Sequence, residues 1–505
     1  MRERNDDRRA DEHEPSRLSN DELAACGALM LLLLASYLLN TFVFPQLAKE
    51  GLFPAGREIS TYCGAACSAA IALAAFRKPS LLRETPLSVA ALAIFACGLA
   101  LLGVAFHTGN SSLAALGSPL GGIGAVWFSV LVGLALVRIG VRASAVAIPL
   151  AFVARYIVQA VIQIAGVVVS PIIALLLYFA CNVCAYALMR PFVRDLVRIA
   201  RKSGAPIELD ATNPSSFLPV SSLVYVSIFL FNAACGFAFS GRAANEPGAV
   251  LLLGSLPVIA VFLVAAGARR RLSADVLYMV STLLVVGGFL LAPLPLAAGG
   301  SAVGEDASGI LLEAGSECFS LLTYYLVAAV GSRNPAGALS TSALATAAGF
   351  LGIGCGALLE QGISHLGAHD AALSMVVASG VTLAFIAFNF CAMRSFSFEA
   401  TIQGVHPMHP AGNGTDAALM GHACPERNLE AASVIAAERF GLTPREVDVL
   451  QLLARGRTSS VIQEKLFLSN NTVKTHVRHI YTKMDVHSQQ ELMTLVESFC
   501  SRDGI

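Results

Sequence analysis

The fold near the carboxyl end is decided by residues 442–499, which read LTPREVDVLQLLARGRTSSVIQEKLFLSNNTVKTHVRHIYTKMDVHSQQELMTLVESF. Thr443, Pro444 and Glu446 have the spacing of a capping box with proline at the first helical position. Apolar residues then recur at helical spacing until Gly456 ends the run. We therefore expect a short helix between these two points.

Three more short helices are expected in the same stretch. The second runs from Thr458 to Phe467, where Ser469 can cap a third, and Ser488 and Glu491 form a capping box that opens a fourth. The third helix has an apolar face of Val473, Val477, Ile480 and Met484 and a polar face of Asn471, Lys474, Thr475, Arg478 and Thr482. This pattern predicts a bundle with one polar, cationic face.

A helix, a tight turn and a second helix with exposed donors form the geometry of a helix-turn-helix module, whose recognition helix enters the major groove. Here the expected recognition helix is residues 470–484. Residues 442–499 carry seven Lys and Arg against six Asp and Glu, so a strong non-specific electrostatic grip is not implied. Lys474, Arg478 and Lys483 nevertheless lie together with no acid between them, which predicts a local cationic surface for phosphates.

The stretch resembles the LuxR-type DNA-binding domain in LTPRE at 442–446, LLARG at 452–456 and SNNTVKTH at 469–476. The resemblance implies that Lys474, Thr475 and Arg478 face the groove and that the last helix, 488–499, forms a dimer surface. Two positions depart from the family: SSVIQ at 459–463 replaces a polar-Lys-Glu-Ile-Ala run, and Gln489 or Gln490 replaces an arginine. The predicted DNA-binding residues are Asn471, Lys474, Thr475, Arg478 and Lys483, and the predicted dimerisation residues are Leu492, Leu495, Val496 and Phe499. The alternative is a small amphipathic domain that docks on a protein partner.

The chain as a whole is far more apolar than a soluble protein. Of its 505 residues, 55% are hydrophobic and 13% are charged, about half the charged share of a soluble protein. Most of the chain is therefore expected in a bilayer. Nearly all of the twelve cysteines lie inside apolar runs, so we interpret them as reduced, buried structural residues.

Residues 1–22 are polar and are interpreted as a cytoplasmic tail, and the apolar run that follows has no small-residue cleavage site. Twelve apolar runs of spanning length are expected within residues 23–393. They are 23–44, 59–76, 87–106, 113–137, 143–164, 166–189, 220–239, 249–266, 276–296, 310–330, 336–359 and 371–393. Twelve spans place both termini on one side of the membrane.

Lys and Arg are unequally distributed between the loops. The loops after even-numbered spans contain fourteen, and those after odd-numbered spans contain three. By the positive-inside rule, the even loops and both termini are expected in the cytoplasm, with the spans in a bacterial inner membrane. A DNA-binding module must also be in the cytoplasm, so the two expectations agree.

The longest loop, 190–219, separates six expected spans from six. This arrangement resembles the major facilitator superfamily, in which two bundles enclose a central cavity. The chain departs from that family at 77–83, where RKPSLLR replaces a signature containing Gly and Asp. The expected fold is all-α, with a twelve-helix transmembrane bundle, six plus six, followed by a small four-helix LuxR-type domain.

Residues 394–428 are rich in glycine and proline and are interpreted as a flexible linker, followed by a lead-in helix at 429–440 that opens a domain at 429–505. The linker contains possible metal ligands at His406, His409, His422 and Cys424. Their spacing fits no strong zinc pattern, so neither a metal nor a cofactor is expected.

Charged side chains inside spans are costly and usually face a cavity or a partner. Arg155 lies in the middle of the fifth span, and Gln159 and Gln163 follow on the same face. Glu313 and Glu317 form a comparable polar stripe in the tenth span. Two interpretations stay open: an ion pair that holds the halves together, and a ligand-sensing site at these five residues.

These features favour a membrane-embedded one-component transcription regulator. Its spans would sense a small-molecule inducer while surrounded by lipid, and its helix-turn-helix domain would bind double-stranded promoter DNA as a homodimer, with RNA polymerase as a further partner. The alternatives are a major-facilitator-like transporter with an appended regulatory domain, and a membrane anchor whose tail binds protein. The sequence contains no phosphate loop and no nucleophile-and-base arrangement, so enzymatic activity is not expected.

Overall fold

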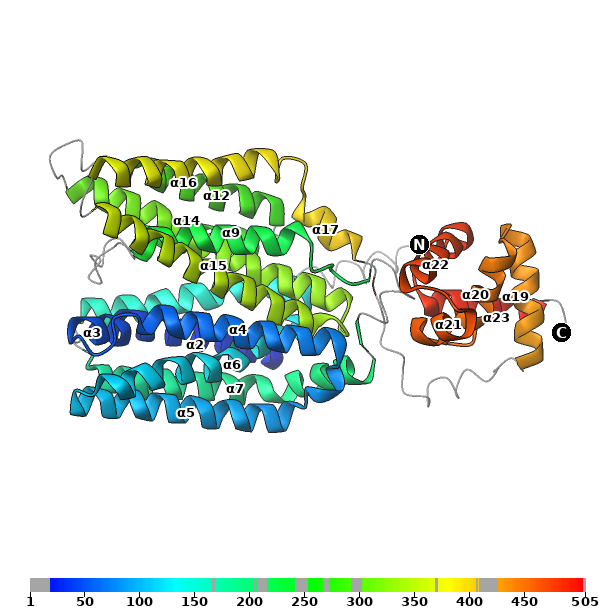
Figure 1. The fold of residues 1–505 in the computed structure, drawn as a ribbon, viewed down its shortest axis with the longest axis horizontal. Coiled ribbons are helices and arrows are strands. Elements are labelled where there is room, and N and C mark those ends of the chain that lie inside the picture. Colours follow the sequence, from blue (N-terminus) through cyan, green and yellow to red (C-terminus); the bar gives the residue numbers. More distant parts are fainter. Residues whose placement is uncertain are drawn as a thin grey trace, which may run out of the picture.

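The chain is all-α. The computed structural model describes residues 19–165, 169–203, 205–206, 216–240, 253–267, 273–291, 302–367, 371–405, 407 and 426–502, and every regular element in these ranges is a helix. Figure 1 shows two groups of helices: a large bundle from the amino-terminal part, and a small domain that begins with α19.

The bundle is built from long apolar helices. They are α2 (Asn20–Leu38), which continues through η1 (Leu39–Val43) into α3 (Phe44–Lys49), then α4 (Gly56–Arg77), α5 (Glu84–Thr108), α6 (Ser111–Ile164), α7 (Pro171–Lys202), α9 (Leu223–Ser240), α11 (Leu256–Gly267), α12 (Ala274–Leu291), α14 (Ala302–Arg333), α15 (Ala338–Gly367) and α16 (Ala371–Cys391). Within the described ranges, nine continuous helices are long and apolar enough to cross a membrane. The chain is therefore a multi-pass membrane protein.

Each of the twelve expected spans overlaps one of these helices, although residues 166–168, 249–252 and 292–296 lie outside the described ranges. The number twelve stays a prediction. The expected burial of the cysteines is wrong in part, because Cys97, Cys184, Cys355 and Cys391 are exposed. Apolar helix surfaces that face lipid tolerate this small apolar side chain as well as a core does.

Two expected spans lie in α6, a run of 54 residues that breaks at Gly140. The φ of 80° and ψ of 171° at Gly140 are non-helical, and a residue with a Cβ rarely adopts a positive φ. Next to the break, the fully buried Ser144 donates its hydroxyl to the carbonyl of Leu136 at 2.9 Å. The hydroxyl replaces the helical partner that the break removes, so the carbonyl of Leu136 stays hydrogen-bonded at the break.

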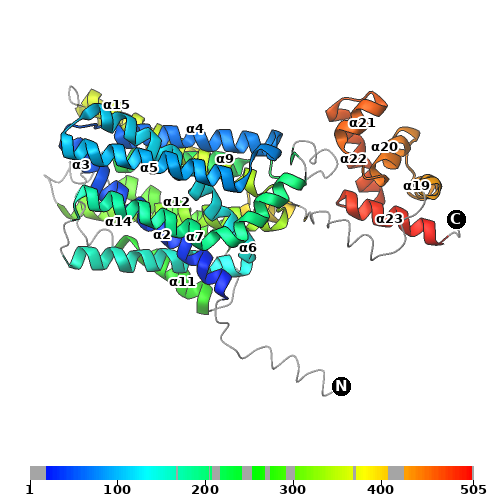
Figure 2. The ribbon, with the colours of Figure 1, turned by 90° about the horizontal axis from the view of Figure 1, so that it is seen from below.

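The bundle helices run along one common direction (Figures 1 and 2). Figure 1 shows α2, α4, α5 and α7 in one layer and α9, α12, α14, α15 and α16 in the other, and α6 packs against both α5 and α14. Helices α9 and α15 approach each other closely, because a Cβ at Gly236, Gly352 or Gly356 would overlap the backbone of the opposite helix. Glycine thus allows these two helices to pack backbone against backbone.

A short helix, α17 (Phe398–Gly404), follows the bundle and is held at both ends. Asp275 of α12 accepts a hydrogen bond from the N–H of Phe398 at 2.6 Å, and Arg333 of α14 donates to the carbonyl of Val405 at 3.1 Å. These contacts stabilise a helix that is too short to be stable alone. The expectation of a flexible linker is therefore wrong for this part of it.

The small domain consists of α19 (Glu426–Phe440), α20 (Pro444–Ala454), α21 (Ser459–Leu466), α22 (Asn470–Met484) and α23 (Gln489–Arg502). The capping box predicted at Thr443 and Glu446 is present and opens α20. The domain has its own hydrophobic core, which includes Ala432, Ala436, Val449, Leu450, Leu453, Ile462, Val473, Val477 and Ile480. The four expected helices and the lead-in helix therefore form one folding unit.

The break in α6 supports a stability prediction. Replacing Gly140 by alanine places a Cβ at a positive φ, which should destabilise the protein by about 1–3 kcal/mol even though no atom lies within 4 Å of the added Cβ. Gly103→Ala in α5 is the matched control, because its Cβ also meets open space but the backbone is helical, where alanine is favoured. Thermal unfolding of the full chain in detergent measures both. Equal midpoints for the two variants would contradict the argument.

Candidate nucleic-acid interface and buried polar cluster

The turn between α21 and α22 sets the direction of the recognition helix. Phe467 ends α21 in the left-handed conformation, with φ of 53°, and is 95% exposed. The N–H groups of Phe467 and Leu468 both donate to the carbonyl of Gln463. Ser469 then caps α22 by accepting a hydrogen bond from the N–H of Thr472 at 3.2 Å. The result is a short turn between two helices, with a hydrogen bond at each of its ends.

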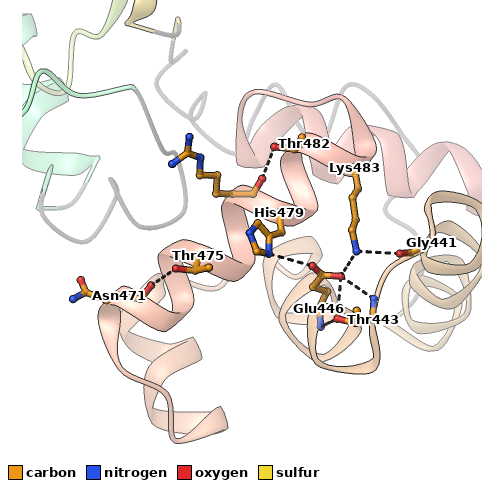
Figure 3. A network of polar contacts seen from close by, with 9 residues as sticks. Gly441, Thr443, Glu446, Asn471, Thr475, His479, Thr482 and Lys483 are labelled. Atoms are coloured by element: carbon orange, nitrogen blue, oxygen red, sulfur yellow. Dashed lines mark hydrogen bonds and ion pairs between the residues drawn. The ribbon is translucent and has the colours of Figure 1, made fainter.

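The two faces of α22 are those predicted. Its apolar residues Val473, Val477, Ile480 and Met484 are all buried in the domain core. Asn471, Thr475, Arg478 and Thr482 are exposed on the opposite face, and Lys474 is half-buried. Thr475 and Thr482 donate to the backbone carbonyls one turn earlier, at 2.9 Å each (Figure 3). This face presents amide, hydroxyl and cationic groups on one rigid helix.

Lys483, at the end of α22, lies in a different environment. Its ammonium is 2.7 Å from Oε2 of Glu446 and donates to the carbonyl of Gly441 at 3.1 Å, and both contacts are drawn in Figure 3. His479 adds a weaker contact, with Nδ1 3.7 Å from Oε1 of Glu446. The ammonium of Lys483 therefore joins the end of α22 to the start of α20. Its predicted contact with DNA stays a prediction.

Glu446 is the centre of this network. Burial acts to raise the pKa of its carboxyl group, but the hydrogen bond from Lys483, together with those from the backbone N–H and hydroxyl of Thr443, lowers the pKa to about 2. The carboxylate is thus ionised at neutral pH and carries both the cap of α20 and the contact to α22. The capping pattern in the sequence identified the first role. No local pattern indicates the second, because 37 residues separate the two partners.

The predicted dimerisation stripe of α23 has a different place in the structure. Leu492 and Val496 are fully buried and Phe499 is 5% exposed, all three within the core of the domain, while Leu495 is only partly buried. We expected the apolar side chains of α23 to be more than the domain core needs and so to be available for dimerisation. For these three side chains that expectation is wrong. The cause is α19, which packs on α23 and extends the core over it. Dimerisation through the remaining surface of α23 stays a prediction.

Gln489 occupies the region where the LuxR pattern has an arginine. Its side-chain amide donates to the carbonyls of Leu453 and Arg457, at 3.1 Å each. The amide therefore satisfies one carbonyl in the last turn of α20 and one in the turn that follows it. The departure from the family pattern leaves the packing of α23 on α20 intact.

The membrane bundle contains a second candidate site, at the contact between α6 and α14. Nη2 of Arg155 is 2.9 Å from Oε1 of Glu317, with side chains 8% and 14% exposed. The guanidinium also lies over the ring of Tyr156, 4.1 Å from its centroid. The structure thus brings together the predicted arginine and one of the two predicted glutamates. Glu313, one turn from Glu317, is near enough for its charge to act on Arg155.

Several polar atoms around this ion pair have no hydrogen-bond partner among the residues that the structure describes. They are Nε of Arg155, the hydroxyl of Tyr156, both amide atoms of Gln159 and Oε1 of Gln163. Gln159 is 2% exposed and Arg155 is 7% exposed, so these atoms are not near the surface. Buried polar groups are normally paired, and each unpaired one costs about 1–3 kcal/mol. The cluster therefore has more hydrogen-bonding capacity than its own residues use.

The lowered pKa of Glu446 predicts a pH-dependent stability for the small domain. Because the folded pKa is depressed from 4.5 to about 2, the stabilisation is complete above pH 4.5 and is lost as the pH falls toward 2. Glu446→Gln should thus destabilise residues 426–505 by roughly 2–3 kcal/mol at pH 7, and by progressively less at lower pH. Urea unfolding from pH 7 to pH 3 measures this, with the exposed Glu438→Gln as control. A constant difference across that range would refute the linkage.

Known transporter structures overlap much of the chain at low similarity. The human organic anion transporter MFSD10 (TETRAN) is 15% identical with a TM-score of 0.47, over 77% of this chain and 99% of the transporter. The Escherichia coli fucose:proton symporter FucP is 13% identical with a TM-score of 0.46, over 74% of this chain and 98% of the symporter.

Sequence relatives match a stretch of about 50 residues of this chain. Oxygen regulatory protein NreC of Staphylococcus haemolyticus is 46% identical over 52 residues, which is 10% of this chain and 24% of NreC. Nitrate/nitrite response regulator protein NarL of E. coli K12 is 44% identical over 50 residues, 10% of this chain and 23% of NarL. The chain thus spans about a quarter of the length of these relatives. Residues 441–496 match the family of bacterial regulatory proteins named luxR. The small domain of this multi-pass membrane protein is therefore a LuxR-type helix-turn-helix domain.

Proposed function

We propose that the protein is a membrane-embedded one-component transcription regulator. The observation that carries the proposal is the exposed donor face of α22, on a LuxR-type domain that shares its chain with a membrane bundle. The bundle senses a small molecule, and the tethered domain binds promoter DNA. The fourteen-to-three distribution of Lys and Arg between the loops supports an inner-membrane protein with both termini in the cytoplasm.

The recognition face supports a specific mode of DNA contact. Asn471, Lys474, Thr475 and Arg478 lie on the side of α22 away from the core, so the helix can enter the major groove with its packing intact. Amide and cationic side chains are the groups that pair with adenine and guanine edges, and Lys483 would contribute positive charge beside a phosphate. Two domains related by a two-fold axis through the exposed part of α23 would read an inverted repeat.

The buried cluster supports the sensing role. A lone ion pair needs only its two members, whereas the atoms around Arg155 and Glu317 add unpaired donors and acceptors from Tyr156, Gln159 and Gln163. A small polar or charged molecule between α6 and α14 would satisfy these groups. Such a ligand stabilises whichever arrangement of the two helices best surrounds it.

A physical route from this cluster toward the DNA-binding domain runs along α14. Glu317 lies within α14, and Arg333 at the end of the same helix holds the last residues of α17. Asp275 of α12 holds the first residue of α17. A shift of α14 against α12 would therefore strain or release α17, which is the last described helix before the DNA-binding domain.

The DNA contact is tested with Lys474→Ala in residues 426–505. Loss of a cation that reaches a base or phosphate should weaken binding by about 1–3 kcal/mol, roughly five- to 150-fold in Kd. Arg439→Ala is the matched control, since it removes one positive charge from the exposed face of α19, which packs on α20 and α23. Gel shifts with the promoter fragment recovered by chromatin capture measure both. Equal affinities for the two variants would exclude Lys474 from the interface.

The sensing role is tested in a strain that carries a reporter gene under the control of this protein. Compounds are screened until one changes the reporter output of the wild type, and that compound serves as the inducer. Gln159→Leu leaves the ion pair intact but removes two unpaired buried atoms, and should raise the half-maximal inducer concentration at least tenfold. Asn389→Leu in α16 is the control, because it removes a partly buried amide whose oxygen accepts a hydrogen bond from the hydroxyl of Tyr278 on the neighbouring helix. Arg155→Gln and Glu317→Gln extend the series, with membrane insertion checked for each.

An unchanged response in Gln159→Leu, Arg155→Gln and Glu317→Gln, all normally inserted, would show that the cluster is not the sensor. Accumulation of the compound inside cells through the membrane part would instead favour a transporter with an appended regulatory domain.

A further inference from the structure

A basic cavity lies between the start of α5 and the last turns of α7, apart from both sites described above. Its volume is about 220 Å³, and four arginines line it: Arg83, Arg194, Arg198 and Arg201. We propose that this pocket binds a phosphate group. Neither the DNA-binding face nor the Arg155 cluster includes any of these residues, so the pocket is a separate site.

The one acidic residue in the lining, Glu84, offsets only one of the four positive charges. The carboxylate of Glu84 accepts hydrogen bonds from Tyr186, from Ser88 at 3.3 Å and from Thr85 at 3.0 Å, and the residue is 6% exposed. Its charge is thus stabilised by hydroxyl groups, including that of Tyr186 on α7 itself. The contact also holds α5 against α7 and so keeps the walls of the cavity in place.

The arginines retain free capacity. Arg198 pairs with Asp195 at 3.3 Å, but both side chains are more than half exposed, so this ion pair is weak. Nε of Arg201 is buried and has no partner among the described residues. Four guanidinium groups around one cavity repel each other, and an anion between them removes that repulsion. Their planar donor forks match phosphate oxygens, which they bind in bidentate fashion.

The position of the pocket indicates two sources for the phosphate. The apolar run of α7 ends at Arg190, and Arg194 follows one helical turn later, about 6 Å further along the axis. This distance places the opening of the pocket at the depth of lipid headgroups on the side of the basic loops, where such pockets bind anionic lipids. A soluble phosphate ester from the cytoplasm offers the same group. Both sources supply a phosphate with negatively charged oxygens, and they are distinguished by experiment.

The test uses the full chain, purified in detergent and stripped of lipid. One arm adds vesicles of phosphatidylcholine with or without phosphatidylglycerol, and measures retained lipid by native mass spectrometry. The other arm titrates inorganic phosphate by calorimetry. The variant is Arg198→Gln with Arg201→Gln, and the matched control is Arg142→Gln with Lys202→Gln, which removes the same charge from exposed positions outside the pocket.

We expect the pocket variant to lose anionic-lipid retention at least tenfold relative to wild type while the control keeps it. Loss of inorganic phosphate binding in the pocket variant, with lipid retention unaffected, supports the proposal with a soluble phosphate ester as the source. The proposal would be overturned if the pocket variant, the control and the wild type retained the same amount of anionic lipid and gave the same phosphate titration curve. Thermal unfolding without ligand shows whether each variant is folded, and Arg198→Lys with Arg201→Lys, which keeps the charge, should restore part of the binding.

Discussion

The membrane part of this protein depends on one constraint: inside a bilayer, polar groups must find partners within the protein. Long helices satisfy their own backbones, and α6 shows how a break is handled, because Ser144 supplies the donor that the carbonyl of Leu136 loses at Gly140. Arg155 meets the same constraint through Glu317. The ion pair thereby joins α6 to α14, and α14 belongs to the layer that also contains α9, α12, α15 and α16. Polar contact also joins α4 to α15, where the buried hydroxyl of Ser68 donates to the carbonyl of Ala343 at 2.8 Å.

The helix that carries Glu317 also carries Arg333. Sixteen residues separate them, which is about 24 Å of helix, long enough to run from the middle of a bilayer beyond its hydrocarbon edge. A helix of this length moves nearly as a rigid rod, so a small displacement at the ion pair also displaces Arg333. Because Arg333 holds α17 through backbone carbonyls, the orientation of α17 is tied to that of α14. Without the hydrogen bonds from Arg333 and to Asp275, a displacement of α14 would not be passed on to residues 398–405.

The sequence predicted the features that depend on local patterns. Capping boxes, glycine stops and the 3.6-residue period located the helices of the small domain, and the periodicity of α22 identified both of its faces. The apolar runs located the membrane helices, and the cost of a mid-span charge singled out Arg155. Four features were not predictable in the same way. The contact of Lys483 with Glu446, the anchors of α17, the burial of the α23 stripe and the arginine pocket all depend on residues distant in sequence that only packing brings together.

Stability alone does not explain the polar cluster. Replacing a buried ion pair by well-packed apolar residues is often neutral or stabilising, and the unpaired atoms of Tyr156, Gln159 and Gln163 add a further cost. If a ligand pairs these atoms in only one arrangement of α6 and α14, the cost is removed in that arrangement alone. The ligand then favours that arrangement over the other. Moving a two-state equilibrium from 1:99 to 99:1 requires about 5.5 kcal/mol of differential binding. Each buried group that gains a partner contributes about 1–3 kcal/mol, so a ligand that satisfies all four of these atoms in one state, and none in the other, at about 1.5 kcal/mol each, supplies about 6 kcal/mol, enough to switch the bundle.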